Sequence, residues 1–212
     1  TVLKDFSKLP AIFVTHSHSD HVGRLVLAYK YGFRGKIVCT MQTALAIPLI
    51  LEDTYKLSLV RWKKNKIRKL YTEEDIKATV NLIYPVKPYN VFKLDESVRA
   101  TFWLNAHLPG SASIYFSING INLFFTGDFK KESVFFKSRR IPAYWRREPC
   151  TIITESTYGD QLTEDQSNEC TLVDNISEAM STKKLMVIFA LSQGRTEEVL
   201  FKLRQMQIDK KL

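Results

Sequence analysis

Three of the four histidines in this 212-residue sequence fall within six positions. They are His16, His18 and His21, and Asp20 lies among them. Neutral imidazole nitrogens beside a carboxylate are a donor set that suits a divalent metal, and zinc first. In an extended segment alternate side chains point to the same side, so we expect His16, His18 and Asp20 to face one way. His21 can join them where a helix begins. The cluster therefore predicts a metal site rather than scattered polar loop residues.

Two further candidate ligands each follow a predicted strand. His107 comes after the strand predicted over 98–104, and Asp128 comes after the strand predicted over 121–126 and a glycine. A loop at the end of a strand is a common place for a ligand, because a rigid scaffold holds it. Taken alone, the histidine is more typical of a turn or packing residue, and the alternative role of the aspartate is a turn residue. As ligands, the histidine completes the site and the carboxylate bridges two cations.

Hydrophobic periodicity predicts strands and helices that alternate at both ends of the chain around a β-rich middle. Pro48 is expected to kink or interrupt one helix. Asn119-Gly120 predicts a tight hairpin, because both central positions of such a turn need a positive φ. A domain boundary is expected in the polar stretch near 158–168. The expected strands are 11–14, 36–39, 91–94, 98–104, 113–118, 121–126, 151–154 and 185–190, and the expected helices are 22–29, 41–51, 73–83, 169–180 and 195–207.

Composition narrows the class of protein. Hydrophobic residues make up 45% and charged residues 25%, as in ordinary globular proteins. No apolar run reaches a membrane-spanning length and no secretory signal opens the chain, so we expect an intracellular protein, cytoplasmic or, in a eukaryote, nuclear. The three cysteines form no C-x-x-C pair and are interpreted as buried or incidental thiols. The formal net charge of +9 favours RNA or DNA as a partner, although basic surfaces also occur without one.

The order of the candidate ligands resembles the metallo-β-lactamase superfamily, whose members carry H-x-H-x-D-H after a strand, then one histidine, then an aspartate. The matching residues are His16, His18, Asp20, His21, His107 and Asp128. The runs TGDF at 126–129, TESTYG at 154–159 and FALSQGRTEE at 189–198 are similar to the β-CASP nucleases, particularly the branch of the cleavage and polyadenylation endonuclease and RNase J. The resemblance implies an α/β fold, with the αββα metallo-β-lactamase sandwich in 1–160 and the start of a β-CASP domain in 161–212.

The resemblance also implies a role for each residue. His16, His18 and His107 hold one zinc ion, Asp20 and His21 serve a second, and Asp128 bridges both. Asp20 also orients the attacking hydroxide as a general base, and Glu155 hydrogen-bonds a ligand histidine and fixes its tautomer. The implied protein is a zinc-dependent ribonuclease that hydrolyses RNA phosphodiester bonds with a two-metal-activated hydroxide, in RNA processing or decay.

Basic residues interleaved with aromatic ones begin just after Asp128 and are the candidate path for single-stranded RNA. A second candidate phosphate site is the predicted helix start at Ser192 and Arg195, where helix capping is the alternative. A homodimer or a processing complex is the expected assembly. The basic residues of the candidate path are Lys130, Lys131, Arg139, Arg140, Arg146 and Arg147.

Two other functions stay open. The run NAHLPG at 105–110 also resembles Artemis-like DNA nucleases, whereas the glutamate at 155 favours the RNA branch, since the DNA branch usually has aspartate there. The third hypothesis is a non-catalytic RNA-binding subunit of a processing complex. The family's earlier strands and last two histidines have no counterpart here, so we expect a fragment. Two zinc ions are expected in the complete protein, and these 212 residues alone are expected to bind the second metal weakly and turn over poorly.

Overall fold

The computed structural model describes residues 5–65, 70–160, 169–190 and 193–210. The chain divides into two compact units. The first comprises residues up to 132 together with 137–155, and the second comprises 133–136 together with the residues from 156 onward. Every candidate ligand belongs to the first unit. The assignment of 1–160 and 161–212 to two named domains stays a prediction.

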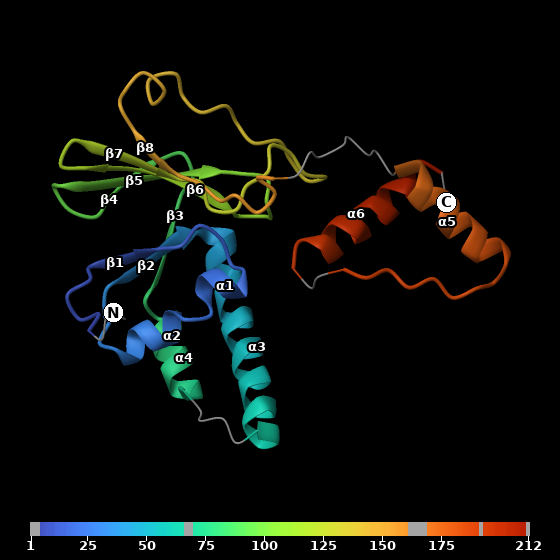
Figure 1. Cartoon of the computed structure of the whole chain (residues 1–212), viewed down its shortest axis with the longest axis horizontal. Helices are drawn as coiled ribbons and strands as arrows, with labels where there is room; N and C mark the ends of the chain where they lie inside the picture. The colour runs from blue at the N-terminus through green and yellow to red at the C-terminus, as the bar shows by residue number, and fades with distance from the viewer. Residues whose placement is uncertain (1–4, 66–69, 161–168, 191–192, 211–212) are drawn as a thin grey trace. The chain divides into compact units, whose positions relative to one another are not determined.

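The first unit is built on two sheets (Figure 1). In one sheet, β1 (Ala11–Phe13), β2 (Lys36–Thr40) and β3 (Ile83–Val86) run parallel in that order. The other sheet has the order β4-β5-β6-β7-β8, with antiparallel neighbours except for the parallel pair β7 and β8. Its strands are β4 (Val91–Lys93), β5 (Val98–Leu104), β6 (Ala112–Ile118), β7 (Ile121–Phe125) and β8 (Thr151–Ile153).

Helices cover the face of the three-stranded sheet that points away from the second sheet (Figure 1). They are α1 (Ser19–Val22), α2 (Leu25–Lys30), α3 (Met41–Asn65) and α4 (Glu73–Val80). In β2 the adjacent residues Ile37 and Val38 are both fully buried, Ile37 in the helical core and Val38 among residues of the second sheet. Successive strand side chains point to opposite faces, so this strand separates two cores. The mixed α/β class predicted from the sequence is confirmed.

Helix α3 runs through Pro48 to Asn65, well beyond the predicted 41–51. Ala44, Ile47 and Leu51 are buried at helical spacing on both sides of the proline. Their packing holds the two turns together and outweighs the hydrogen bond that proline cannot make, so Pro48 does not end the helix.

The predicted helix over 73–83 is shorter in the structure, and a strand follows it. Thr72 and Asp75 form the expected capping box, with Thr72 N donating to Asp75 Oδ2 at 2.8 Å. The helix ends at Val80, and β3 begins at Ile83 and contains Pro85. The strand was missed because proline argues against one. It is tolerated here because β3 is the edge of its sheet and only β2 pairs with it.

The hairpin between β6 and β7 forms as predicted. Asn119 and Gly120 have φ values of 49° and 80°, the positive values that such a turn requires. A side chain added at Gly120 would meet nothing within 4 Å. The tip of this hairpin is therefore open.

Of the thiols, Cys39 is fully buried in β2, and burial raises its pKa to about 12. Cys150 is partly exposed, and the side chain of Cys170 lies outside the described residues. The interpretation of Cys39 as a buried thiol is therefore confirmed.

The second unit contains α5 (Glu169–Ser181) and α6 (Arg195–Ile208). The strand predicted over 185–190 is wrong, because no strand is assigned there. Leu185 is 91% exposed and Phe189 is 95% exposed. A strand needs a neighbour for its backbone hydrogen bonds, and no described strand pairs with this segment.

Within the described residues, no helix combines the length and the apolar character needed to span a bilayer.

Candidate metal centre

The corner that carries the first histidines is held by both sheets. Val14 N donates to Val38 O at 2.9 Å, which extends the β1–β2 pairing by one residue. Thr15 O accepts from Ala112 N at 2.9 Å, so the corner is also tied to the first residue of β6. Helix α1 then begins at Ser19. His16 and His18 therefore lie where the two sheets meet.

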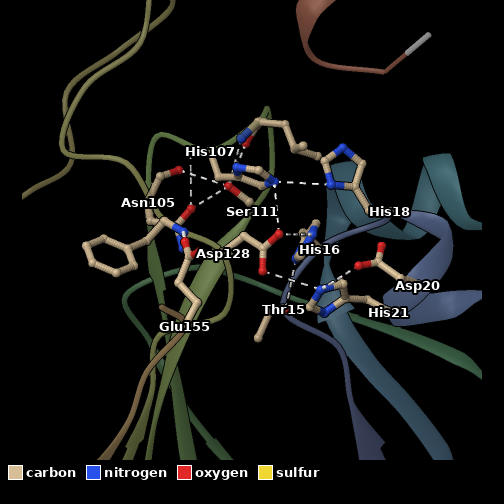
Figure 2. A network of polar contacts seen from close by, with 12 residues as sticks. Thr15, His16, His18, Asp20, His21, Asn105, His107, Ser111, Asp128 and Glu155 are labelled. Carbon is tan, nitrogen blue, oxygen red and sulfur yellow. Dashed lines mark hydrogen bonds and ion pairs between the residues drawn. The ribbon is translucent and has the colours of Figure 1, made fainter. Parts of the chain in front are cut away.

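Four side chains from three parts of the chain converge beside this corner (Figure 2). One donor atom each from His16, His18, His107 and Asp128 lies within 4.8 Å of the other three. His107 Nε2 is 3.1 Å from His18 Nδ1, and Asp128 Oδ2 is 3.6 Å from Nε2 of both His16 and His107. Zinc–ligand bonds of about 2.0–2.1 Å in a tetrahedron separate neighbouring donors by about 3.3 Å. These distances therefore suit the coordination of one ion.

The second carboxylate oxygen of Asp128 faces a different pair of side chains. Asp128 Oδ1 is 3.4 Å from His21 Nε2, which is 3.6 Å from Asp20 Oδ2 (Figure 2). Asp20 lies in the first turn of α1 and not in an extended segment, and its side chain is 75% exposed. It is not part of the group of four. The extended backbone expected at Asp20 is wrong, and its service to a second metal stays a prediction. Asp128 thus lies between two sets of donors.

His16 is the buried centre of the group. Its side chain is fully buried, and burial together with the neighbouring imidazoles lowers its pKa to about 2. Thr15 Oγ1 lies 3.0 Å from Nδ1, whereas Nε2 has no hydrogen-bond partner among the described residues. Burial is also the main cause that lowers the pKa of His107. A buried polar atom without a partner is costly, and a neutral imidazole nitrogen is a good metal ligand. The residues therefore fit a metal ion.

Asn105, to which the sequence analysis gave no role, joins the two loops that carry His107 and Asp128. Its Oδ1 accepts from His107 N at 3.3 Å and from Ser111 Oγ at 2.6 Å. Its Nδ2 donates to Thr126 O at 3.2 Å, two residues before Asp128, and lies 3.3 Å from Ser113 Oγ. A buried amide that satisfies both its ends fixes the distance between the loops. The signals in the sequence were a polar residue at the end of a strand and its place in the run NAHLPG at 105–110.

The His107 loop is also fastened to the start of α3. Thr40 Oγ1 and Thr43 Oγ1 donate to Gly110 O at 2.6 and 3.1 Å. Gly110 has a φ of 86°, and a Cβ there would lie 2.5 Å from Gln42 Cβ. The two threonines are buried contributors that the sequence analysis also missed.

Gly127 allows Asp128 to approach the histidine corner. It has a φ of 57°, and a Cβ there would lie 2.8 Å from Thr15 Cβ. Thr15 is the residue whose hydroxyl contacts His16. The backbone before Asp128 therefore packs directly against the residue that orients the buried ligand.

Glu155 supports the loop after Asp128. Its Oε1 accepts from Phe129 N at 2.8 Å, and its own N–H donates to Thr126 Oγ1 at 3.3 Å. Its negative charge raises the pKa of His107 against the effect of burial. The predicted hydrogen bond from Glu155 to a ligand histidine stays a prediction.

The predicted nucleic-acid residues fall in both units. Lys130 is half-buried, and its charge contributes to lowering the pKa of His107. Arg195 belongs to the second unit, where its Nη1 pairs with Glu198 Oε2 at 2.9 Å in the first turn of α6. Ser192 lies outside the described residues. The exposed members are Lys131, Arg139, Arg140, Arg146 and Arg147.

Comparisons with known proteins give a match to one family model and a set of similar relatives. Residues 2–157 match the family model described as Anti-Pycsar protein Apyc1. The transcription termination factor FttA of Methanocaldococcus jannaschii is 30% identical over 202 residues, which are 93% of this chain and 31% of the relative. An RNase J-like protein of the same organism is 30% identical over 200 residues, covering 92% of this chain and 44% of the relative. The endoribonuclease ysh1 of Emericella nidulans is 29% identical over 207 residues, covering 95% of this chain and 23% of the relative. The chain thus spans less than half the length of these relatives.

Proposed function

This chain belongs to the family described as Anti-Pycsar protein Apyc1 and, within the metallo-β-lactamase superfamily, to the β-CASP nucleases, and from that premise we propose that it is the metal-binding part of a zinc-dependent ribonuclease. The proposed reaction is hydrolysis of a phosphodiester bond in single-stranded RNA, during RNA processing or decay. One observation carries the proposal: the two carboxylate oxygens of Asp128 face two different sets of donors. The activity, substrate and partners of the whole protein all belong to this proposal.

The proposed ligand sets follow the two sides of Asp128. His16, His18 and His107 with Asp128 Oδ2 hold one zinc ion. His21 and Asp20 with Asp128 Oδ1 hold the second. When bound, zinc polarises the phosphate and lowers the pKa of a bound water to about 7. Because burial keeps His16 neutral, the lone pair of its Nε2 is available to a metal ion at any physiological pH.

Asp20 and Glu155 have separate tasks in this proposal. The Asp20 carboxylate is exposed beside His21, so its oxygen is placed to accept a proton from an attacking water. Glu155 holds the main chain directly after Asp128 and so keeps the bridging carboxylate in position. The first task concerns the reaction, and the second concerns the geometry of the site.

RNA is the proposed substrate for two reasons. Two of the relatives are named as an endoribonuclease and an RNase J-like protein. In addition, the resemblance places glutamate at position 155 in the RNA branch. A homodimer or a processing complex, and an intracellular location, stay predictions.

The test measures metal content and cleavage in the complete protein. We expect two zinc ions per chain and faster cleavage of a 5′-labelled single-stranded RNA than of the matched DNA. Asp128→Asn should lose bound zinc and reduce the rate about 100-fold or more, because it removes charge from both ligand sets. Asp53→Asn, an exposed position on α3, is the matched control and should change neither value.

Two outcomes would contradict the proposal. Faster cleavage of the DNA would favour the DNA-nuclease alternative. RNA binding without cleavage, by a protein that never holds two zinc ions, would favour a non-catalytic subunit.

A further inference from the structure

A second group of side chains lies on the outer face of the five-stranded sheet, beside β5. Trp103 points outward, because its neighbour Phe102 is buried between the sheets. The ring of Tyr89 meets that of Trp103 edge-on, with centroids 4.9 Å apart. The guanidinium of Arg139 lies 4.3 Å above the Tyr89 ring, and Trp103 Nε1 donates to Arg139 O at 2.9 Å. Two rings therefore hold both the side chain and the main chain of Arg139.

Tyr89 adopts a backbone conformation that residues other than glycine rarely adopt. Its φ is 67°, in the left-handed region, and its N–H donates to Phe102 O at 2.8 Å. Residues in such conformations persist only where their surroundings determine them, and they cluster at binding sites. The strained residue here is the one whose ring carries Arg139.

The contact with the Tyr89 ring leaves Arg139 able to bind an anion. A cation–π contact uses none of the guanidinium's N–H donors in a hydrogen bond. Arg139 is exposed, and none of the ion pairs among the described residues involves it. By contrast, the nearby Lys137 pairs with Glu132 at 2.8 Å. Arg139 thus presents a forked donor of the shape that matches a phosphate group.

Backbone hydrogen bonds connect this arginine to the metal centre. Trp103 precedes His107 by four residues on β5 and its loop, which is at most about 13 Å of extended chain. Ser138 N donates to Lys131 O at 2.9 Å, and Ser138 Oγ donates to Lys130 O at 2.9 Å. Lys130 O also accepts from Ala106 N at 3.1 Å. The segment before Arg139 is therefore tied to both loops that carry metal-ligand candidates.

We propose that Arg139 binds a backbone phosphate of a single-stranded RNA whose neighbouring phosphodiester reaches the metal centre. Tyr89 and Trp103 are then positioning residues, which hold the guanidinium in place before the RNA arrives. Pre-ordering a long side chain removes part of the entropy cost of binding. The inference rests on the proposed function, since it names where that substrate is gripped.

The first experiment measures binding of a fluorescent single-stranded RNA by anisotropy, with a chelator present so that no RNA is cut. Arg139→Gln should weaken binding about 10-fold at low salt and reduce the slope of log K against log salt by about 0.7, the value for one contact to a single strand. Arg99→Gln removes the same charge from the opposite end of β5 and should weaken binding less than about twofold. Equal effects of the two variants would overturn the proposal.

The second experiment tests the two rings. Tyr89→Asn suits the left-handed backbone and removes the ring, and Trp103→Phe removes the indole N–H donor together with one of the two fused rings. Both should weaken binding about 3-fold with the salt slope unchanged, because the charge remains. Arg139→Lys should also weaken binding about 3-fold with the salt slope unchanged. Because Arg139 is exposed, this variant tests the forked guanidinium even where a ring variant is unstable. Wild-type affinity in correctly folded Tyr89→Asn and Trp103→Phe would overturn the positioning role.

The outcomes separate this inference from the proposed function. A protein that binds RNA through Arg139 but never cuts it with zinc bound would contradict the nuclease and leave the inference standing. A protein that cuts RNA while Arg139→Gln behaves like Arg99→Gln would contradict the inference alone. Absence of RNA binding by the wild-type protein would overturn both.

Discussion

The strand before the histidine corner and the segment 185–190 have similar apolar sequences and opposite surroundings. Residues 11–14 pair with β2, and Val14 is 4% exposed. In the other segment Leu185 and Phe189 are more than 90% exposed, and no strand forms. An apolar run therefore specifies only the capacity to become a strand, and the neighbouring strand supplies the hydrogen bonds. Because residues 11–14 pair with β2, the histidines that follow them are also held in place at the candidate metal centre.

The largest combined effect on stability and zinc binding is expected where one side chain joins the two ligand loops. Asn105→Ala removes a buried amide that makes four hydrogen bonds, and we expect a loss of about 4 kcal/mol in the free energy of unfolding at about 1 kcal/mol per net hydrogen bond. Zinc affinity should also fall at least about 10-fold. Urea unfolding and chelator competition measure the two effects. The exposed Asn90→Ala is the control, and equal losses would contradict the role of Asn105.

Two glycines with positive φ sharpen the comparison between packed and open positions. Gly127→Ala adds both backbone strain and contact with Thr15, so we expect a loss of about 2–3 kcal/mol. Gly120→Ala adds only the strain, about 1 kcal/mol, because nothing lies within 4 Å. Thermal or urea unfolding of the two variants gives the difference. An equal loss in both would show that Gly127 is not constrained by Thr15.

Acid should weaken the metal-free protein through His16. The pKa of this residue is about 2 in the folded chain, against an ordinary value of 6.5, because of burial. The unfolded chain therefore binds a proton below pH 6.5 that the folded chain does not, and stability falls as the pH falls. We expect a loss of about 2 kcal/mol between pH 6.5 and 5. Urea unfolding in a chelator measures it, and His16→Gln should abolish this contribution. A stability independent of pH would contradict the buried state of His16.

The smallest effect is expected in the exposed segment. Phe189→Ala should change the free energy of unfolding by less than about 0.5 kcal/mol, because the ring is 95% exposed. Phe102→Ala, at a fully buried position between the sheets, should cost about 3–5 kcal/mol. Calorimetry of both variants tests this contrast. A large loss for Phe189→Ala would mean that segment 185–190 packs against a partner.

The sequence was most informative where one local rule decided the structure. The Asn119-Gly120 turn, the capping box at Thr72 and the strand over 98–104 follow from turn chemistry, side-chain hydrogen bonding and alternation. The convergence of His107 and Asp128 on the histidine corner came from the family resemblance, because spacing alone does not bring loops about 20 and 90 residues apart together.

Features that depend on tertiary contacts were not predictable from the sequence. Pro48 lies inside α3 because residues on both sides of it are buried, and β3 includes Pro85 because it is an edge strand. The role of Asn105 needs the positions of two loops at once. The helical conformation of Asp20 was missed because α1 begins one residue before it, and helix starts are poorly defined by single-sequence patterns.

The open hairpin at Asn119 and Gly120 offers a practical attachment point. The strand β6 begins at Ala112 beside the metal centre and ends at Ile118, so the turn lies at the far end of the sheet. An exposed tip with free space around it tolerates inserted residues. A short cysteine-bearing insertion there could therefore anchor the protein to a surface for single-molecule work while the end that carries the candidate metal ligands stays unobstructed.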